Sequence, residues 1–193
     1  MATPPLVIVI AGPNGAGKST AAAHLLPAEM TFINADEVAK TLPNYPSRQA
    51  DLEAGRIVLG RMDEQERLRA TFAVETTLAG RTLATRIARL RTIGYRFRLA
   101  FLFVPDADLS VARVAGRVRL GGHHIPEDTI RRRHGLGIAN FFRLYQPLAD
   151  NWAVFDTTQM GPPQTIAEGT MSQVLRVADP HAWRLMKMRS HDE

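Results

Sequence analysis

The chain has 193 residues, 45% of them hydrophobic, which is the size and composition of one globular domain with a sizeable core. It contains no cysteine, so disulfides and thiolate metal sites are excluded and a cytoplasmic location is expected. No apolar run approaches the roughly 18 residues that span a bilayer, and the amino terminus has no basic signal-peptide segment.

The net charge is +5, and 21 of the 24 basic residues are arginine. A basic balance is typical of nucleic-acid binding, of a pocket for several phosphates, or of an arginine-biased genome. The longest basic run, residues 131–133, has three arginines, and aromatic residues are not interleaved with basic ones. The composition therefore favours the phosphate pocket and the genomic bias over nucleic-acid binding.

The first predicted element is a buried strand over residues 6–11. Residues 12–19, GPNGAGKS, match the pattern G-x-x-x-x-G-K-[ST] of a phosphate-binding loop, and a helix follows that ends at Pro27. Strand, loop and helix in this order bring backbone N–H groups and a helix N-terminus around one anionic pocket. We therefore expect a nucleotide to contact Gly12, Asn14, Gly15, Ala16, Gly17, Lys18, Ser19 and Thr20, with Lys18 on the β- and γ-phosphates and the Ser19 hydroxyl on Mg²⁺.

Strands and helices alternate along the rest of the chain. The patterns predict strands over residues 30–34, 71–76, 97–104 and 152–155, and helices over residues 48–69, 81–93, 109–120 and from Pro126 to about residue 144. Residues 162–190 are expected to form a helical tail, with a helix over 165–177. The alternation indicates a single domain, residues 1–193, with a mostly parallel sheet in the three-layer α/β/α architecture of P-loop NTPases.

In such a sheet, ligands bind outside the carboxyl ends of the strands. Asp36 follows the second strand, where it could accept the proton of an attacking hydroxyl or cap the short helix beginning at Glu37. Glu75 and Thr76 follow the third strand and could bind acceptor hydroxyls or a Mg²⁺-bound water, or could be an ordinary strand end. Asp106 suits a helix N-cap better than a magnesium ligand.

Two predicted helices flank Gly121 and Gly122, and residues 113–134 are expected to form a lid. Each helix carries three arginines, which a closing lid would bring to the phosphates, although solvated surface positions also suit most of them: Arg113, Arg117, Arg119, Arg131, Arg132 and Arg133. Arg113 and Arg117, four residues apart, share one helix face. His123 and His124 are expected to be exposed in the lid, since no carboxylate or histidine stands at ligand spacing.

Several of these segments together resemble the zeta toxin family of P-loop kinases, and in particular its short stand-alone bacterial members. The resemblance covers roughly residues 5–158 and rests on residues 12–20, 32–36, 74–78, 112–118, 121–126, 130–133, 140–141 and 150–156. It implies phosphorylation of a hydroxyl by ATP and Mg²⁺, in well-known members the 3′-hydroxyl of the sugar in UDP-N-acetylglucosamine. An antitoxin protein is a partner to consider, although toxicity does not follow from the kinase chemistry.

The resemblance also implies roles for single residues. Asp36 would be the catalytic base and, with Asn34, Glu75 and Thr76, would contact the acceptor. The phosphates would be contacted by Lys18, by Arg117 and by the run 131–133, in which we assign Arg132 to catalysis and Arg133 to nucleotide binding. The chain departs from the family at His134, where short members carry an aromatic residue.

The sequence therefore predicts an ATP-dependent kinase that phosphorylates a hydroxyl of a small molecule, most plausibly a nucleotide sugar. One alternative is a polynucleotide 5′-hydroxyl kinase, which the basic charge favours and the lack of a stacking-aromatic groove disfavours. Another is a nucleotide-dependent switch that acts through a protein partner. Such a switch does not need Asp36 as a base.

Overall fold

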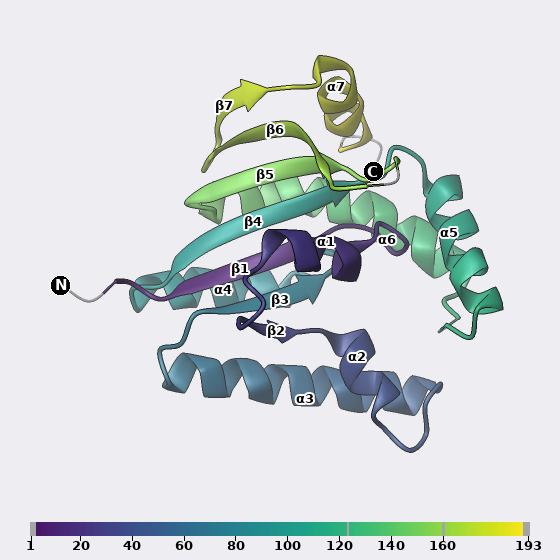
Figure 1. Cartoon of the computed structure of the whole chain (residues 1–193). Helices are drawn as coiled ribbons and strands as arrows, with labels where there is room; N and C mark the ends of the chain where they lie inside the picture. Colours follow the sequence, from purple (N-terminus) through teal and green to yellow (C-terminus); the bar gives the residue numbers. More distant parts are fainter. Residues whose placement is uncertain (1–2, 123, 160, 191–193) are drawn as a thin grey trace.

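The computed structural model describes residues 3–122, 124–159 and 161–190, which fold around a seven-stranded sheet (Figure 1). The strands, in chain order, are β1 (Leu6–Ala11), β2 (Thr31–Ile33), β3 (Phe72–Thr76), β4 (Arg96–Phe103), β5 (Asn151–Asp156), β6 (Gln164–Thr170) and β7 (Gln173–Val177). Their order across the sheet is β2-β3-β1-β4-β5-β6-β7. The first five strands are parallel, and β6 and β7 each run antiparallel to the strand before them.

Helices cover both faces of this sheet (Figure 1). They are α1 (Lys18–Leu25), α2 (Ala35–Lys40), α3 (Arg48–Arg67), α4 (Thr82–Thr92), α5 (Ala107–Arg119), α6 (Glu127–Asn140) and α7 (Pro180–Arg189). Because side chains alternate along a strand, Val7 and Val9 face the core under α4, α6 and α7, whereas Ile8 and Ile10 face α1. The predicted three-layer α/β/α fold is confirmed.

The sheet order brings distant segments of the chain to the end of β1. β3 lies beside β1, with Ile10 opposite Glu75 and Ala11 opposite Thr76. The Gly12 N–H donates to the Thr76 carbonyl oxygen at 3.2 Å. The loop after β1 therefore starts beside the carboxyl end of β3, and β2 ends one strand further along the same edge.

The predicted helical tail over 162–190 is wrong for most of its length, since only α7 is helical. Residues 164–170 and 173–177 form the hairpin β6–β7, which extends the sheet beyond β5. The cause is tertiary: β5 would otherwise present an unpaired edge, and β6 pairs with it. At Gly169 a Cβ would come within 2.5 Å of the Trp152 ring, so this strand packs closely on β5.

The end of one helix also differs from the prediction. The helix after Pro126 is α-helical only to Asn140, and Phe141–Tyr145 form a π-helical turn. This turn places the buried Phe141 ring between those of Phe101 and Trp152, with centroids 5.2 and 5.9 Å away.

His124 is exposed as expected, whereas His123 lies outside the described residues. In the described part of the chain, no helix is both long and apolar enough to cross a membrane.

Candidate active site

The loop between β1 and α1 has the backbone shape that a bound phosphate needs. Gly12 has a φ of +146°, and a Cβ there would lie 2.6 Å from the Leu102 carbonyl oxygen, so only glycine fits. Gly17 occupies the N-cap of α1 in the left-handed conformation and has no side chain to cap the helix. The N–H groups of the first turn of α1 are therefore available to an anion, and the helix dipole favours one there.

Lys18 is buried at the floor of this loop, with 8% of the residue exposed. Its Nζ donates to the Pro13 carbonyl oxygen at 3.0 Å and lies 3.7 Å from Glu75 Oε1. Burial lowers the pKa of Lys18, whereas the negative charges of Glu75 and Asp36 raise it. A second anionic partner would stabilise an ammonium group that is buried in this way. The shape of the loop suits a phosphate as that partner.

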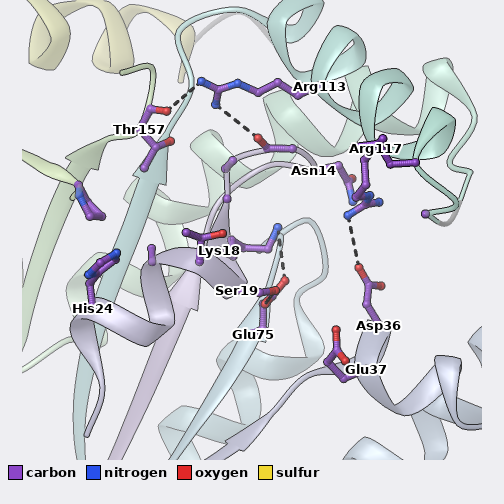
Figure 2. Close-up of a pocket in the computed structure, with 18 of the residues that line it drawn as sticks. Asn14, Lys18, Ser19, His24, Asp36, Glu37, Glu75, Arg113, Arg117 and Thr157 are labelled. Atoms are coloured by element: carbon purple, nitrogen blue, oxygen red, sulfur yellow. Dashed lines mark hydrogen bonds and ion pairs between the residues drawn. The ribbon is translucent and has the colours of Figure 1, made fainter. Parts of the chain in front are cut away.

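Ser19, Asn34 and Glu75 form one hydrogen-bonded group. Ser19 and Glu75 lie beside Lys18 (Figure 2). The Ser19 hydroxyl donates to Glu75 Oε2 at 2.9 Å, and Asn34 Nδ2 donates to the same oxygen at 2.8 Å. Burial raises the pKa of Glu75, while Lys18 and the Ser19 hydrogen bond lower it. This hydroxyl and carboxylate are the oxygen donors that Mg²⁺ prefers.

Asp36 lies across the cavity from this group, at the start of α2. The N-cap of α2 is Asn34, whose Oδ1 accepts from the N–H groups of Asp36 and Glu37 at 2.8 and 3.4 Å. The alternative that Asp36 itself caps the helix is therefore wrong. Its side chain is half exposed, and its Oδ2 lies 3.9 Å from Arg117 Nη1 on α5 (Figure 2).

Arg113 and Arg117, both on α5, line the cavity. Arg113 extends between the phosphate-binding loop and the segment after β5: its guanidinium donates to the Gly15 carbonyl at 3.4 Å and to the Thr157 and Thr158 carbonyls at 2.9 and 3.1 Å. Arg113 thus links the phosphate-binding loop to the segment after β5. The sequence signal for Arg113 was its spacing of four from Arg117, but it was not among the predicted site residues.

The run 131–133 contributes less than predicted. Arg131 pairs outward with Asp108 and Glu127, at 2.5 and 2.7 Å. Arg132 is exposed and is not among the described residues that line the cavity. Arg133 is half-buried and close enough for its charge to lower the pKa of Lys18. The catalytic assignment of Arg132 is therefore not supported.

Three further predicted positions have structural roles. The Thr76 hydroxyl accepts from the Leu78 N–H at 3.1 Å and so closes the turn after β3, away from the cavity lining. Asn34 uses both ends of its amide within the protein, so it positions Ser19, Glu75 and α2 rather than an acceptor. Asp106 is the N-cap of α5, as expected.

The cavity formed by these groups has a volume of about 800 Å³. In Figure 2, His24 and Thr157 lie on one side of Lys18, and Asp36 and Glu37 lie on the other. Sequence reasoning missed His24 and Thr157, which come from the last turn of α1 and the loop after β5. Among the described residues, no cluster of three or more histidine, cysteine, aspartate or glutamate side chains could hold a metal ion. A magnesium ion here would need oxygen ligands from its nucleotide, as is usual for Mg²⁺.

Comparisons with known proteins agree with this fold. An uncharacterised protein of Haemophilus influenzae is 30% identical over 127 residues, which are 66% of this chain and 91% of that protein. Two solved structures have similar folds. AvrRxo1-ORF1 in its complex with ORF2 and ATP has a TM-score of 0.74 and 16% identity over 96% of this chain, which spans 64% of that chain.

The second is from the PezAT chromosomal toxin-antitoxin system of Streptococcus pneumoniae. It has a TM-score of 0.66 and 15% identity, covering 97% of this chain and 86% of that one. At these identities the two structures show a shared fold, the P-loop kinase-like α/β/α fold. Residues 7–135, which contain the phosphate-binding loop, Asp36, Glu75 and both cavity arginines, match the AAA_33 family, described as an AAA domain, and the chain belongs to this family.

Proposed function

We propose that the protein is an ATP-dependent kinase that transfers the γ-phosphoryl group to a hydroxyl of a small molecule. The observation that carries the proposal is the position of Asp36. This carboxylate faces Lys18 and Ser19 across one cavity, does not cap its helix, and has an arginine from the lid 3.9 Å away. A nucleotide switch needs the loop but has no use for a carboxylate there.

In the proposed reaction, the acceptor hydroxyl oxygen attacks the γ-phosphorus of ATP. The new O–P bond forms as the bond to the β–γ bridging oxygen breaks, ADP leaves, and the hydroxyl proton passes to a carboxylate oxygen of Asp36. Lys18 and Arg117 stabilise the charge on the transferring group. Mg²⁺ fits beside Ser19 and Glu75, and when bound it would neutralise part of the phosphate charge.

The identities of the acceptor, of a protein partner and of the nucleotide donor are also proposals. The resemblance to zeta toxins supports a sugar hydroxyl as the acceptor, with UDP-N-acetylglucosamine as the first compound to test. An antitoxin-like protein partner is supported by the two structural neighbours, which come from a two-protein complex and a toxin-antitoxin system. We also propose that ATP, rather than another nucleotide, is the donor, since one neighbour was solved with ATP.

The test is transfer of labelled phosphate from γ-labelled ATP into a metabolite extract, followed by mass spectrometry of the labelled product. We expect one labelled small molecule with the wild-type protein and none with Asp36→Asn. A protein that releases only inorganic phosphate, at the same rate with and without the extract, would instead be an ATPase switch.

A further inference from the structure

We infer that Asn140 is a positioning residue of the candidate active site, which acts by holding the loop between β3 and α4 against the phosphate-binding loop. This β3–α4 loop, residues 77–81, follows Glu75 and Thr76 at the end of β3. The inference rests on the proposed function, since it assumes that the phosphate-binding loop binds ATP. Asn140 is the last residue of α6, is 6% exposed and is not among the described residues that line the cavity.

Leu78, in the β3–α4 loop, has an unusual backbone conformation. Its φ is +57°, in the left-handed region that residues other than glycine rarely adopt, and the residue is fully buried. Such a conformation persists only where the surrounding contacts enforce it, and strain of this kind collects at binding and catalytic sites. The contacts that hold Leu78 are therefore candidates for a role in the site.

The last turn of α6 contacts the β3–α4 loop at two successive carbonyl groups. Asn140 Nδ2 donates to the Leu78 carbonyl oxygen at 2.7 Å, in a buried position. Gly137 lies so close to the loop that a Cβ there would come within 2.5 Å of the Thr77 carbonyl oxygen. One helix thus sets the direction of both carbonyl groups and, with them, the conformation of Leu78.

The same segment is tied to the phosphate-binding loop through Thr76. The Thr76 hydroxyl accepts from the Leu78 N–H at 3.1 Å, and the Thr76 carbonyl oxygen accepts from the Gly12 N–H at 3.2 Å. Because each peptide group is a rigid plane, relaxation of Leu78 would rotate the peptide groups before it and move the acceptor of the Gly12 N–H. Glu75, whose carboxylate accepts from Ser19, directly precedes Thr76 and would be disturbed as well.

Tyr145 provides an internal comparison for Asn140. Its hydroxyl donates to the Gly80 carbonyl oxygen at 2.9 Å, so it makes the same kind of bond to the same loop. Gly80 lies on the α4 side of Leu78, further along the chain from Thr76. Loss of either hydrogen bond should lower the stability of the domain, but only loss of the Asn140 bond should reach the phosphate-binding loop.

The first test compares Asn140→Ala with Tyr145→Phe. Isothermal titration calorimetry measures the affinity for ATP·Mg²⁺, and urea denaturation measures the free energy of unfolding. We expect both variants to be less stable than the wild type. Asn140→Ala should bind ATP·Mg²⁺ about tenfold more weakly, the size of effect that follows the loss of one buried hydrogen bond, whereas Tyr145→Phe should keep the wild-type affinity.

Wild-type affinity in folded Asn140→Ala protein, or equal losses of affinity in the two variants, would overturn the inference. Calorimetry needs no acceptor, so its result does not depend on phosphate transfer. A wild-type protein that binds ATP but phosphorylates no acceptor would contradict the proposed function and leave this test intact. A wild-type protein that binds no ATP would overturn both.

The second test reaches the β3–α4 loop without removing a hydrogen-bonding group, and it applies even if Asn140→Ala folds poorly. In Gly137→Ala, the added methyl group must displace either the Thr77 carbonyl or α6, and both displacements change the contact of Asn140 with Leu78. Alanine also favours the helix, so the variant should fold. We expect about tenfold weaker ATP·Mg²⁺ binding.

Gly60→Ala is the control for this variant. Gly60 lies in the middle of α3, and nothing lies within 4 Å of a Cβ built there, so the substitution should leave ATP·Mg²⁺ affinity unchanged. Wild-type affinity in Gly137→Ala, or the same loss in Gly60→Ala, would show that the β3–α4 loop does not control the nucleotide site and would overturn the inference.

Discussion

The two ends of the cavity are built differently. At the phosphate end, Lys18 and Asn34 are buried. Glu75 is joined to Asn34 and to the exposed Ser19 by hydrogen bonds of 2.8 and 2.9 Å and lies 3.7 Å from Lys18. At the acceptor end, the side chains of Asp36 and Arg117 are about half exposed and lie 3.9 Å apart. One end is a hydrogen-bonded network, whereas the other contains a long ion pair between half-exposed side chains.

This difference indicates where binding free energy comes from. A preorganised network loses little conformational entropy when phosphates arrive, so it suits tight nucleotide binding. An exposed ion pair contributes at most about 1 kcal/mol, so a ligand can replace it at small cost. ATP should therefore bind to a site that already exists, whereas the acceptor end should be completed only when ATP and acceptor are both present.

The largest effect should come from the phosphate end. Lys18→Ala should reduce ATP·Mg²⁺ affinity by at least about 10²-fold, because it removes the buried charge that we propose as the partner of the phosphates. Isothermal titration calorimetry measures the affinity, and circular dichroism checks that the protein is folded. Lys187→Ala is the matched control. Wild-type ATP affinity in folded Lys18→Ala protein would show that the loop does not bind the nucleotide.

At the acceptor end, Asp36→Asn should leave ATP affinity nearly unchanged and lower the transfer rate by about 10²-fold or more, the usual contribution of a general base. Amide and carboxylate have the same shape, so packing is preserved. Glu53→Gln, at an exposed carboxylate on α3, serves as the control. If Asp36→Asn turns over at the wild-type rate, Asp36 is not the base.

Arg117→Gln should lower kcat about tenfold and change ATP affinity less, since its guanidinium stabilises charge that develops during transfer. The control is Arg119→Gln, an exposed arginine on the same helix. Arg133→Gln should have a smaller effect than Arg117→Gln, and Arg132→Gln none. Steady-state kinetics with ATP and the identified acceptor decide the order. Equal effects at all four positions would mean that the lid arginines are only surface charge.

The shape of the phosphate-binding loop could be predicted because that shape is local. A glycine-rich loop between a strand and a helix specifies its own geometry within a dozen residues, and Asp36 follows from the rule on strand ends. The residues that contact Glu75 were harder to predict from the sequence, because these contacts depend on β3 lying beside β1. Which arginine of 131–133 points inward depends on helix phase. The hairpin β6–β7 was missed because β6 is stabilised by pairing with β5, and this pairing is non-local.

The smallest predicted effect concerns the free-energy cost of burying the Glu75 carboxylate at the phosphate end. Burial raises the pKa of Glu75 above its ordinary value of 4.5. Glu75 therefore binds its proton more tightly in the folded state than in the unfolded state. Its contribution to stability is fully present below pH 4.5 and is lost as the pH rises through the raised pKa. The loss amounts to about 1.4 kcal/mol for each unit by which the pKa is raised.

The variant that isolates this contribution is Glu75→Gln, which keeps the shape and a hydrogen-bond acceptor but does not titrate. The free energy of unfolding of the wild type, relative to Glu75→Gln, should fall between pH 4.5 and neutral pH, as measured by urea denaturation across that range. A constant difference at every pH would mean that Lys18 and Ser19 compensate the buried charge of Glu75 completely, so that the network is held without an electrostatic cost.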